Sequence, residues 1–101
     1  MAVMRFVDPA TEAWEQLRQP ANRHAVVLRA RELLDDIDFD TARAWESAQD
    51  VVIPGVTSRV RRTLIEAGDP SLWVYWRVPG EVDWTAEREV DVEVLDFVFD
   101  Y

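Results

Sequence analysis

The sequence predicts an α+β domain in which a short N-terminal strand and a helical hairpin precede an antiparallel β-sheet. Three observations carry this prediction. Apolar residues recur at helical spacing early in the chain, aromatic and β-branched residues dominate its end, and strong turn residues lie between them. The length of 101 residues suits a single domain spanning 1–101 with one hydrophobic core.

Composition and charge argue against several classes of protein. The chain carries 11 basic and 20 acidic side chains, hence a net charge of −9, with no cysteine and one histidine. A general nucleic-acid coating protein would be basic, because phosphate neutralisation supplies most non-specific affinity. Without thiolates or several histidines we expect no metal and no cofactor. No apolar run is long enough to span a bilayer and no signal peptide is evident, so we expect a cytoplasmic protein without membrane contact.

The N-terminal part predicts one strand followed by two helices. Residues 3–7 favour a strand, and Asp8-Pro9 is typical of a helix start, with Asp8 as the cap and Pro9 in the first turn. Residues 9–18 and about 21–37 carry apolar side chains at helical spacing, which predicts a helical hairpin.

The next stretch is less clear. Acidic residues gather at 35–40, where a helix C-terminus disfavours negative charge, so we expect the second helix to fray there. Residues 38–50 fit either a short third helix or a loop anchored by Trp45.

Residues 51–67 fit two structures almost equally well. As a helix, the segment has Val56, Val60 and Leu64 four residues apart. As a strand, it places Arg62 on one face and Arg59 and Arg61 on the other.

The C-terminal part predicts two antiparallel strands, at 72–78 and from Val90 onward, joined by a polar connection. Alternation places Trp73 and Tyr75 on one face of the first strand and Leu72, Val74 and Trp76 on the other, so we expect at least one of these sets in the core.

Charge is spread unevenly along the chain. Residues 56–65 contain three arginines and no acid, whereas residues 79–101 contain eight acids against Arg88. The basic stretch could contact phosphates or an acidic partner, or its arginines could pair with acids of 81–93 and the neighbouring strand. Trp73 and Tyr75 could likewise stack nucleobases beside arginine or simply pack in the core.

Four segments of the chain resemble the RelE/ParE superfamily of toxin–antitoxin proteins. Residues 8–17 and 28–35 are similar to the first and second helices of that family. Residues 73–78 (WVYWRV) resemble its Y-R-V-x-Y-x-V strand, and residues 92–97 (VEVLDF) its V-x-V-L-x-V closing strand. The resemblance implies the strand alternative for 56–65.

The resemblance also implies a function. Members of the family act as metal-free, ribosome-dependent mRNA endonucleases or as gyrase poisons, and a cognate antitoxin neutralises them. The resemblance implies a catalytic set of Arg61, Arg62, Arg77 and Tyr101. Arg59, Trp73 and Tyr75 would bind nucleic acid or a partner protein. A second hypothesis, suggested by the acidic charge, is a non-catalytic protein-interaction module, immunity-like or regulatory, on the same scaffold.

Overall fold

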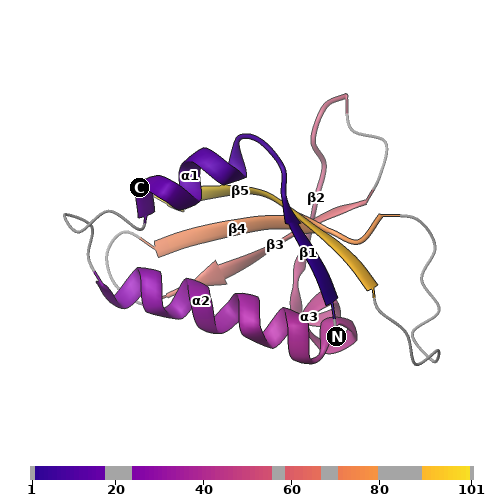
Figure 1. The fold of residues 1–101 in the computed structure, drawn as a ribbon. Helices are drawn as coiled ribbons and strands as arrows, with labels where there is room; N and C mark the ends of the chain where they lie inside the picture. The colour runs from indigo at the N-terminus through magenta and orange to yellow at the C-terminus, as the bar shows by residue number, and fades with distance from the viewer. Residues whose placement is uncertain (1, 18–23, 56–58, 67–70, 80–89, 101) are drawn as a thin grey trace.

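The structure, a computed structural model, describes residues 2–17, 24–55, 59–66, 71–79 and 90–100. Within these ranges it contains three α-helices and one five-stranded mixed sheet, which confirms the predicted α+β class (Figure 1). The elements in chain order are β1 (Ala2–Phe6), α1 (Ala10–Leu17), α2 (His24–Phe39), α3 (Thr41–Ser47), β2 (Gln49–Val51), β3 (Val60–Ile65), β4 (Ser71–Arg77) and β5 (Val90–Asp100). None of the described helices is both long and apolar enough to cross a membrane.

The strands follow the spatial order β1-β5-β4-β3-β2. Strands β2 to β5 form an antiparallel meander, and β1 joins its far edge parallel to β5 (Figure 1). The antiparallel pairing of the two C-terminal strands was predicted and is confirmed. The parallel β1–β5 pair was not predicted, because local sequence patterns do not specify which distant strands become neighbours.

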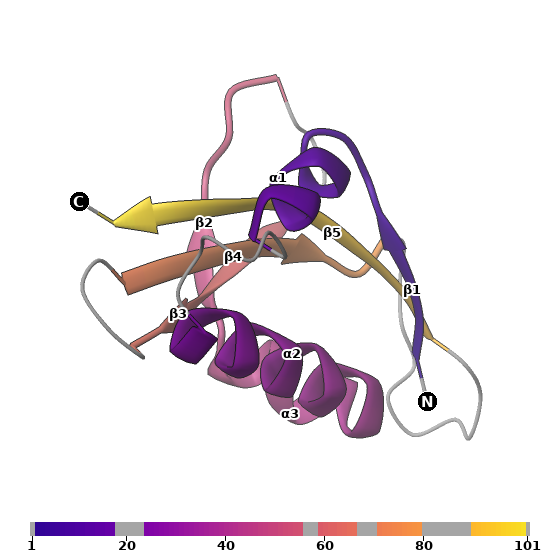
Figure 2. The same cartoon turned by 60° about the vertical axis from the view of Figure 1, so that its left-hand side comes forward.

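The core lies between the sheet and the helices, which all pack on the same face (Figures 1 and 2). On β4, alternation buries Leu72, Val74 and Trp76 completely. This confirms the prediction that at least one face of this strand lies in the core. Trp45 of α3 packs edge-on against Trp76, with ring centroids 5.1 Å apart.

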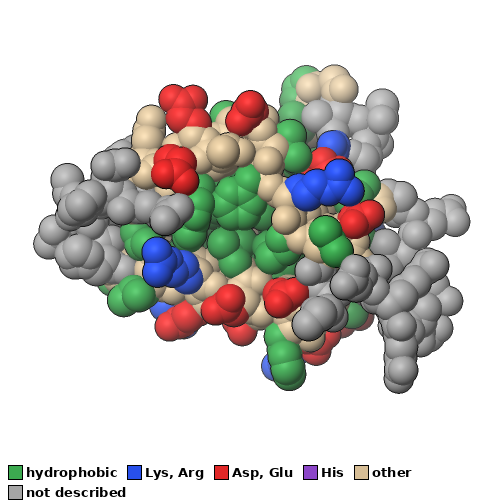
Figure 3. Space-filling view, in the orientation of Figure 1, with side chains coloured by type: hydrophobic (Ala, Val, Ile, Leu, Met, Phe, Trp, Pro, Cys, Tyr) green, Lys and Arg blue, Asp and Glu red, His purple; other side chains and the backbone are tan. Residues whose placement is uncertain are grey.

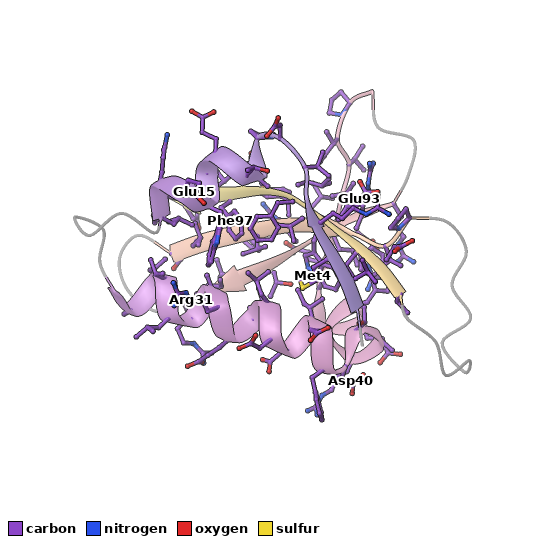
Figure 4. The ribbon with its side chains drawn as sticks, in the orientation of Figure 1. Met4, Glu15, Arg31, Asp40, Glu93 and Phe97 are labelled. Carbon is purple, nitrogen blue, oxygen red and sulfur yellow. The ribbon has the colours of Figure 1, made fainter. Side chains whose placement is uncertain are left out.

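At the other end of the core, Phe97 of β5 lies between α1 and α2 (Figure 4). It stacks on Trp14 of α1 at 5.2 Å and contacts Phe6 of β1 at 5.8 Å. Apolar side chains are visible between the charged rims of the two helices (Figure 3).

A β-bulge in β5 explains its change of hydrophobic pattern. Tyr75 pairs with Asp96 but Trp76 pairs with Val94, so Leu95 is an extra residue. Before the bulge Val94 faces the core, and after it Phe97 does. In the sequence, valines alternate with acids up to Val94, whereas the residues from Leu95 to Phe99 are apolar except for Asp96, and this change of pattern accompanies the bulge.

The ambiguous segments now have defined structures. Residues 60–65 form a strand, so the helical alternative is wrong for them. Residues 41–47 form a helix, whose first turn is capped by the Asp40 carboxylate accepting from the Arg43 N–H at 3.3 Å. Strand β2, which follows this helix, was not predicted.

Two predictions about helix ends are wrong. Helix α2 continues to Phe39 instead of fraying within the acidic run. Helix α1 begins at Ala10, after a cis Asp8–Pro9 bond, and the Pro9 carbonyl accepts from the Ala13 N–H at 3.0 Å. Pro9 thus precedes the helix instead of occupying its first turn.

Candidate functional site

The candidate site lies on the side of the sheet that the described helices leave uncovered, here called the open face. The register of β3 and β4 places Arg62 opposite Tyr75, beside Trp73 and on the same face as Arg77. These four side chains form the centre of the open face, and all are half-buried.

Arg62 lies over the ring of Trp73 and beside that of Tyr75. Its guanidinium carbon lies 3.8 Å from the Trp73 ring centroid and 6.0 Å from that of Tyr75. Its Nη1 donates to the Tyr75 hydroxyl at 3.2 Å, and its Nε donates to Gln49 Oε1 of β2 at 3.0 Å. A guanidinium has five N–H donors, so a fixed fork of this kind is suited to a phosphate or carboxylate.

The charges of two further arginines on the open face, Arg77 and Arg5, are balanced by acidic side chains. Arg77 Nη2 lies 3.0 Å from Glu93 Oε2, and both side chains are largely buried. Arg5 lies 3.9 Å from Asp91 at the surface. Glu93, labelled in Figure 4, comes from β5, which pairs with both β4 and β1. The open face is therefore a mixed surface and not a uniformly basic one.

A cavity of about 370 Å³ adjoins Arg77 and Tyr75 on the open face. Its polar lining comes from Asp8, Tyr75, Arg77 and Asp96, and its apolar lining comes from Pro9, Ile53, Leu95 and Val98. Asp96 is turned by the bulge and accepts from the Phe97 N–H at 2.8 Å. A cavity with these groups can enclose a planar or aliphatic group and bond its polar edge.

Arg59 and Arg61 lie on the opposite side of β3 and share the carboxylate of Asp50 in β2. Arg59 donates to it through Nε at 2.8 Å and Nη2 at 3.0 Å, and Arg61 Nε lies 3.1 Å away. The hydrogen bond from Arg59 is the largest cause that lowers the pKa of Asp50 from 3.8 to about 2. Desolvation opposes it, and the weaker effects of the Arg61 hydrogen bond and of the two arginine charges lower the pKa further.

Arg61 also ties the sheet to a helix. Its Nη1 donates to the Trp45 carbonyl, its guanidinium carbon lies 4.9 Å from the Trp45 ring centroid, and its side chain is only 13 % exposed. These contacts give Arg61 a structural role between β3 and α3.

The structure therefore divides the residues singled out in the sequence. Arg62, Trp73, Tyr75 and Arg77 come together on the open face, whereas Arg59 and Arg61 lie behind it. Neighbouring strand residues point to opposite faces, so Arg61 and Arg62 cannot grip one phosphate together. Tyr101 lies outside the described residues.

The sequence did not predict that Arg62 would contact Gln49 or that Arg59 and Arg61 would contact Asp50. Gln49 and Asp50 come from β2, a strand of three residues without a hydrophobic pattern of its own. The ion-pair alternative named acids of residues 81–93, most of which lie outside the described ranges, and of the neighbouring strand. Among the described residues, Arg59 and Arg61 pair with Asp50 of β2, the strand next to β3.

Comparison with protein-family models, with curated proteins and with solved structures finds no significant match. What the site can do chemically must therefore be argued from its own groups. These are one aromatic-stacked guanidinium, one phenol hydrogen-bonded to it, and an adjoining cavity with two carboxylates.

Proposed function

We propose that this chain is the toxin-type component of a toxin–antitoxin pair of RelE/ParE type, a growth inhibitor that acts in the cytoplasm and is neutralised by a cognate antitoxin. The order of a first strand, helices α1 and α2 and the antiparallel strands β3 to β5 supports this proposal, because the layout that the sequence resemblance implies has the same order, while α3 and β2 are additions to it.

One observation carries the proposal furthest. Arg62 stacks on Trp73 and bonds the Tyr75 hydroxyl on the open face of the sheet. Aromatic rings beside arginine are the groups that stack unpaired bases and hold the phosphates next to them. If the protein cleaves mRNA on the ribosome, Arg62 would stabilise the charge of the phosphate transition state and Tyr75 would lie beside it, without a metal ion.

A second candidate function is a non-catalytic module that binds a protein. It is favoured by the pairing of Arg77 with Glu93 and of Arg5 with Asp91, which removes much of the attraction of the open face for RNA. The net charge of −9 favours a basic partner surface in the same way.

Induced expression in a bacterial host distinguishes the two functions. We expect the wild-type chain to arrest growth and Arg62→Ala to relieve the arrest, because this variant removes the stacked guanidinium. Arg29→Ala is the matched control, since Arg29 is an exposed arginine of α2 paired with Glu32, and it should arrest growth as the wild type does.

The readouts are culture density, soluble protein level, and mapping of cleaved mRNA ends in the arrested cells. Wild-type expression without arrest would contradict the toxin proposal and favour the binding module. Arrest that persists in Arg62→Ala would show that the open face is not the effector site.

A further inference from the structure

Phe39, the last residue of α2, is unusually exposed. Its exposed fraction is 89 %, although burying a phenylalanine side chain is worth about 1.5–3 kcal/mol. It lies between Asp38 and Asp40, in the acidic residues 35–40. The sequence predicts fraying of α2 in this stretch, but the helix continues to Phe39. An aromatic ring displayed among carboxylates is a combination that a protein partner can use as an anchor point.

A groove adjoins this ring where α2 meets α3, at the position of Asp40 in Figure 4. Its volume is about 410 Å³, which accommodates a few side chains. Leu33, Phe39 and Ala44 supply apolar walls, and Asp36 and Asp40 supply carboxylates against one arginine, Arg43. Thr63 of β3 also lines it, so the groove reaches the helix-covered face of the sheet.

The negative charge around the groove would attract positively charged groups. The last turn of α2 contains no basic residue, although a helix C-terminus carries about half a negative charge. Asp35, Asp36 and Asp40 are all exposed at this end of the helix. The repulsion among these groups would be relieved by positive charge from outside the chain.

We infer that the groove at the α2–α3 junction, with Phe39 at its rim, binds a basic segment of a protein partner that inserts an apolar side chain. Charge complementarity selects this occupant, since an acidic rim repels nucleic acid and also repels a second copy of a chain with net charge −9. The inference rests on the proposed function only for the identity of the partner: if the chain is a toxin, the partner is its antitoxin.

Phage display of a random peptide library of about 12 residues tests the inference on the intact protein. The library is panned on wild type after depletion on Phe39→Ser, and enriched peptides are measured by fluorescence anisotropy. We expect peptides with two or more Arg or Lys around an apolar residue. Their affinity should fall at least about 10-fold in Phe39→Ser, and it should also fall as salt is raised.

Leu28→Ser is the matched control, because Leu28 is a half-exposed leucine of the same helix that does not line the groove. It should bind the peptides within about 2-fold of wild type, a change of under about 0.5 kcal/mol. Circular dichroism confirms that both variants are folded, and both side chains are exposed enough for this to be expected.

Three results would overturn the inference. They are the absence of enriched peptides, enriched peptides without basic residues, and equal binding to wild type and Phe39→Ser. Self-association that Phe39→Ser abolishes would assign the groove to a second copy instead. Because binding is measured without reference to toxicity, its failure is distinguishable from a failure of the growth test.

Discussion

At the scale of single residues, Trp76 shows how a polar group in the core is matched by a specific partner. Trp76 is fully buried, and its indole Nε1 donates to Thr63 Oγ1 at 3.1 Å. Without that hydroxyl the indole N–H would be buried unsatisfied, which typically costs about 1–3 kcal/mol. Strand alternation predicted that at least one of the two faces of β4 would be buried, without deciding for the face of Trp76. The hydroxyl partner depends on the β3–β4 register, which the sequence did not specify.

Asp50 supplies a pH-dependent contribution to stability. Its pKa is about 2 in the folded protein and 3.8 in the absence of its arginine partners. Between pH 4 and pH 2 the unfolded chain therefore binds more protons at this site, so the contribution is complete above about pH 4 and disappears as pH falls through about 2.

We expect Asp50→Asn to be less stable than wild type at pH 6 and to approach wild-type stability near pH 2. Urea unfolding followed by tryptophan fluorescence at several pH values measures the difference. Asp91→Asn is the control, because Asp91 is a similarly exposed strand carboxylate with one distant arginine. A difference that stays constant from pH 6 to pH 2 would disprove the ion-pair interpretation.

At the scale of elements, the sequence predicted the strands and helices with a strong hydrophobic period. Helices α1 and α2 and strands β1, β4 and β5 all lie close to their predicted ranges. Strand β2 was missed because a strand of three residues, two exposed and one half-buried, leaves no hydrophobic period to detect. The open-face cluster was partly predictable, since the strand alternative for 56–65 already separated Arg62 from Arg61.

Helix α2 ends with acidic residues, which the helix dipole disfavours at a C-terminus. If these acids bind a basic partner, a change that stabilises the helix end should weaken that binding. Asp36→Arg would replace a carboxylate in the last turn by a cation and place it four residues after Glu32. We expect a gain of about 0.3–1 kcal/mol in the free energy of unfolding.

The same variant should weaken binding of the basic peptides selected on the α2–α3 groove, because Asp36 lines that groove. Glu12→Arg, an exposed position in the first turn of α1, is the control and should show no gain in stability. Chemical denaturation and peptide anisotropy measure the two effects. A variant that is both less stable and equally competent for binding would contradict this account of the helix end.

At the scale of the whole molecule, one core connects all three helices to the sheet. Residues of α1 and α2 join those of β3, β4 and β5 in a single buried cluster, against which Trp45 of α3 packs. The Cα radius of gyration is 13.4 Å, close to the roughly 13 Å of a compact domain of this length.

We therefore predict that residues 1–101 unfold in one cooperative transition. Far-ultraviolet circular dichroism reports the helices and sheet, while tryptophan fluorescence reports the core around Trp14, Trp45 and Trp76. The two denaturation curves should coincide. Separate midpoints would show that part of the chain folds independently of this core.

The parallel pairing of β1 with β5 has a consequence for synthesis of the chain. Ala2 pairs with Val90, and α1 packs chiefly on β5, so β1 and α1 lack these neighbours until β5 has been made, although β1 also contacts α2. At roughly 5–20 residues per second this interval lasts several seconds, far longer than β-hairpin formation in microseconds. During it Phe6 and Trp14 lack Phe97, the ring that both of them contact in the finished protein. The packing of β1 and α1 is thus completed only after the later strand β5 has been made.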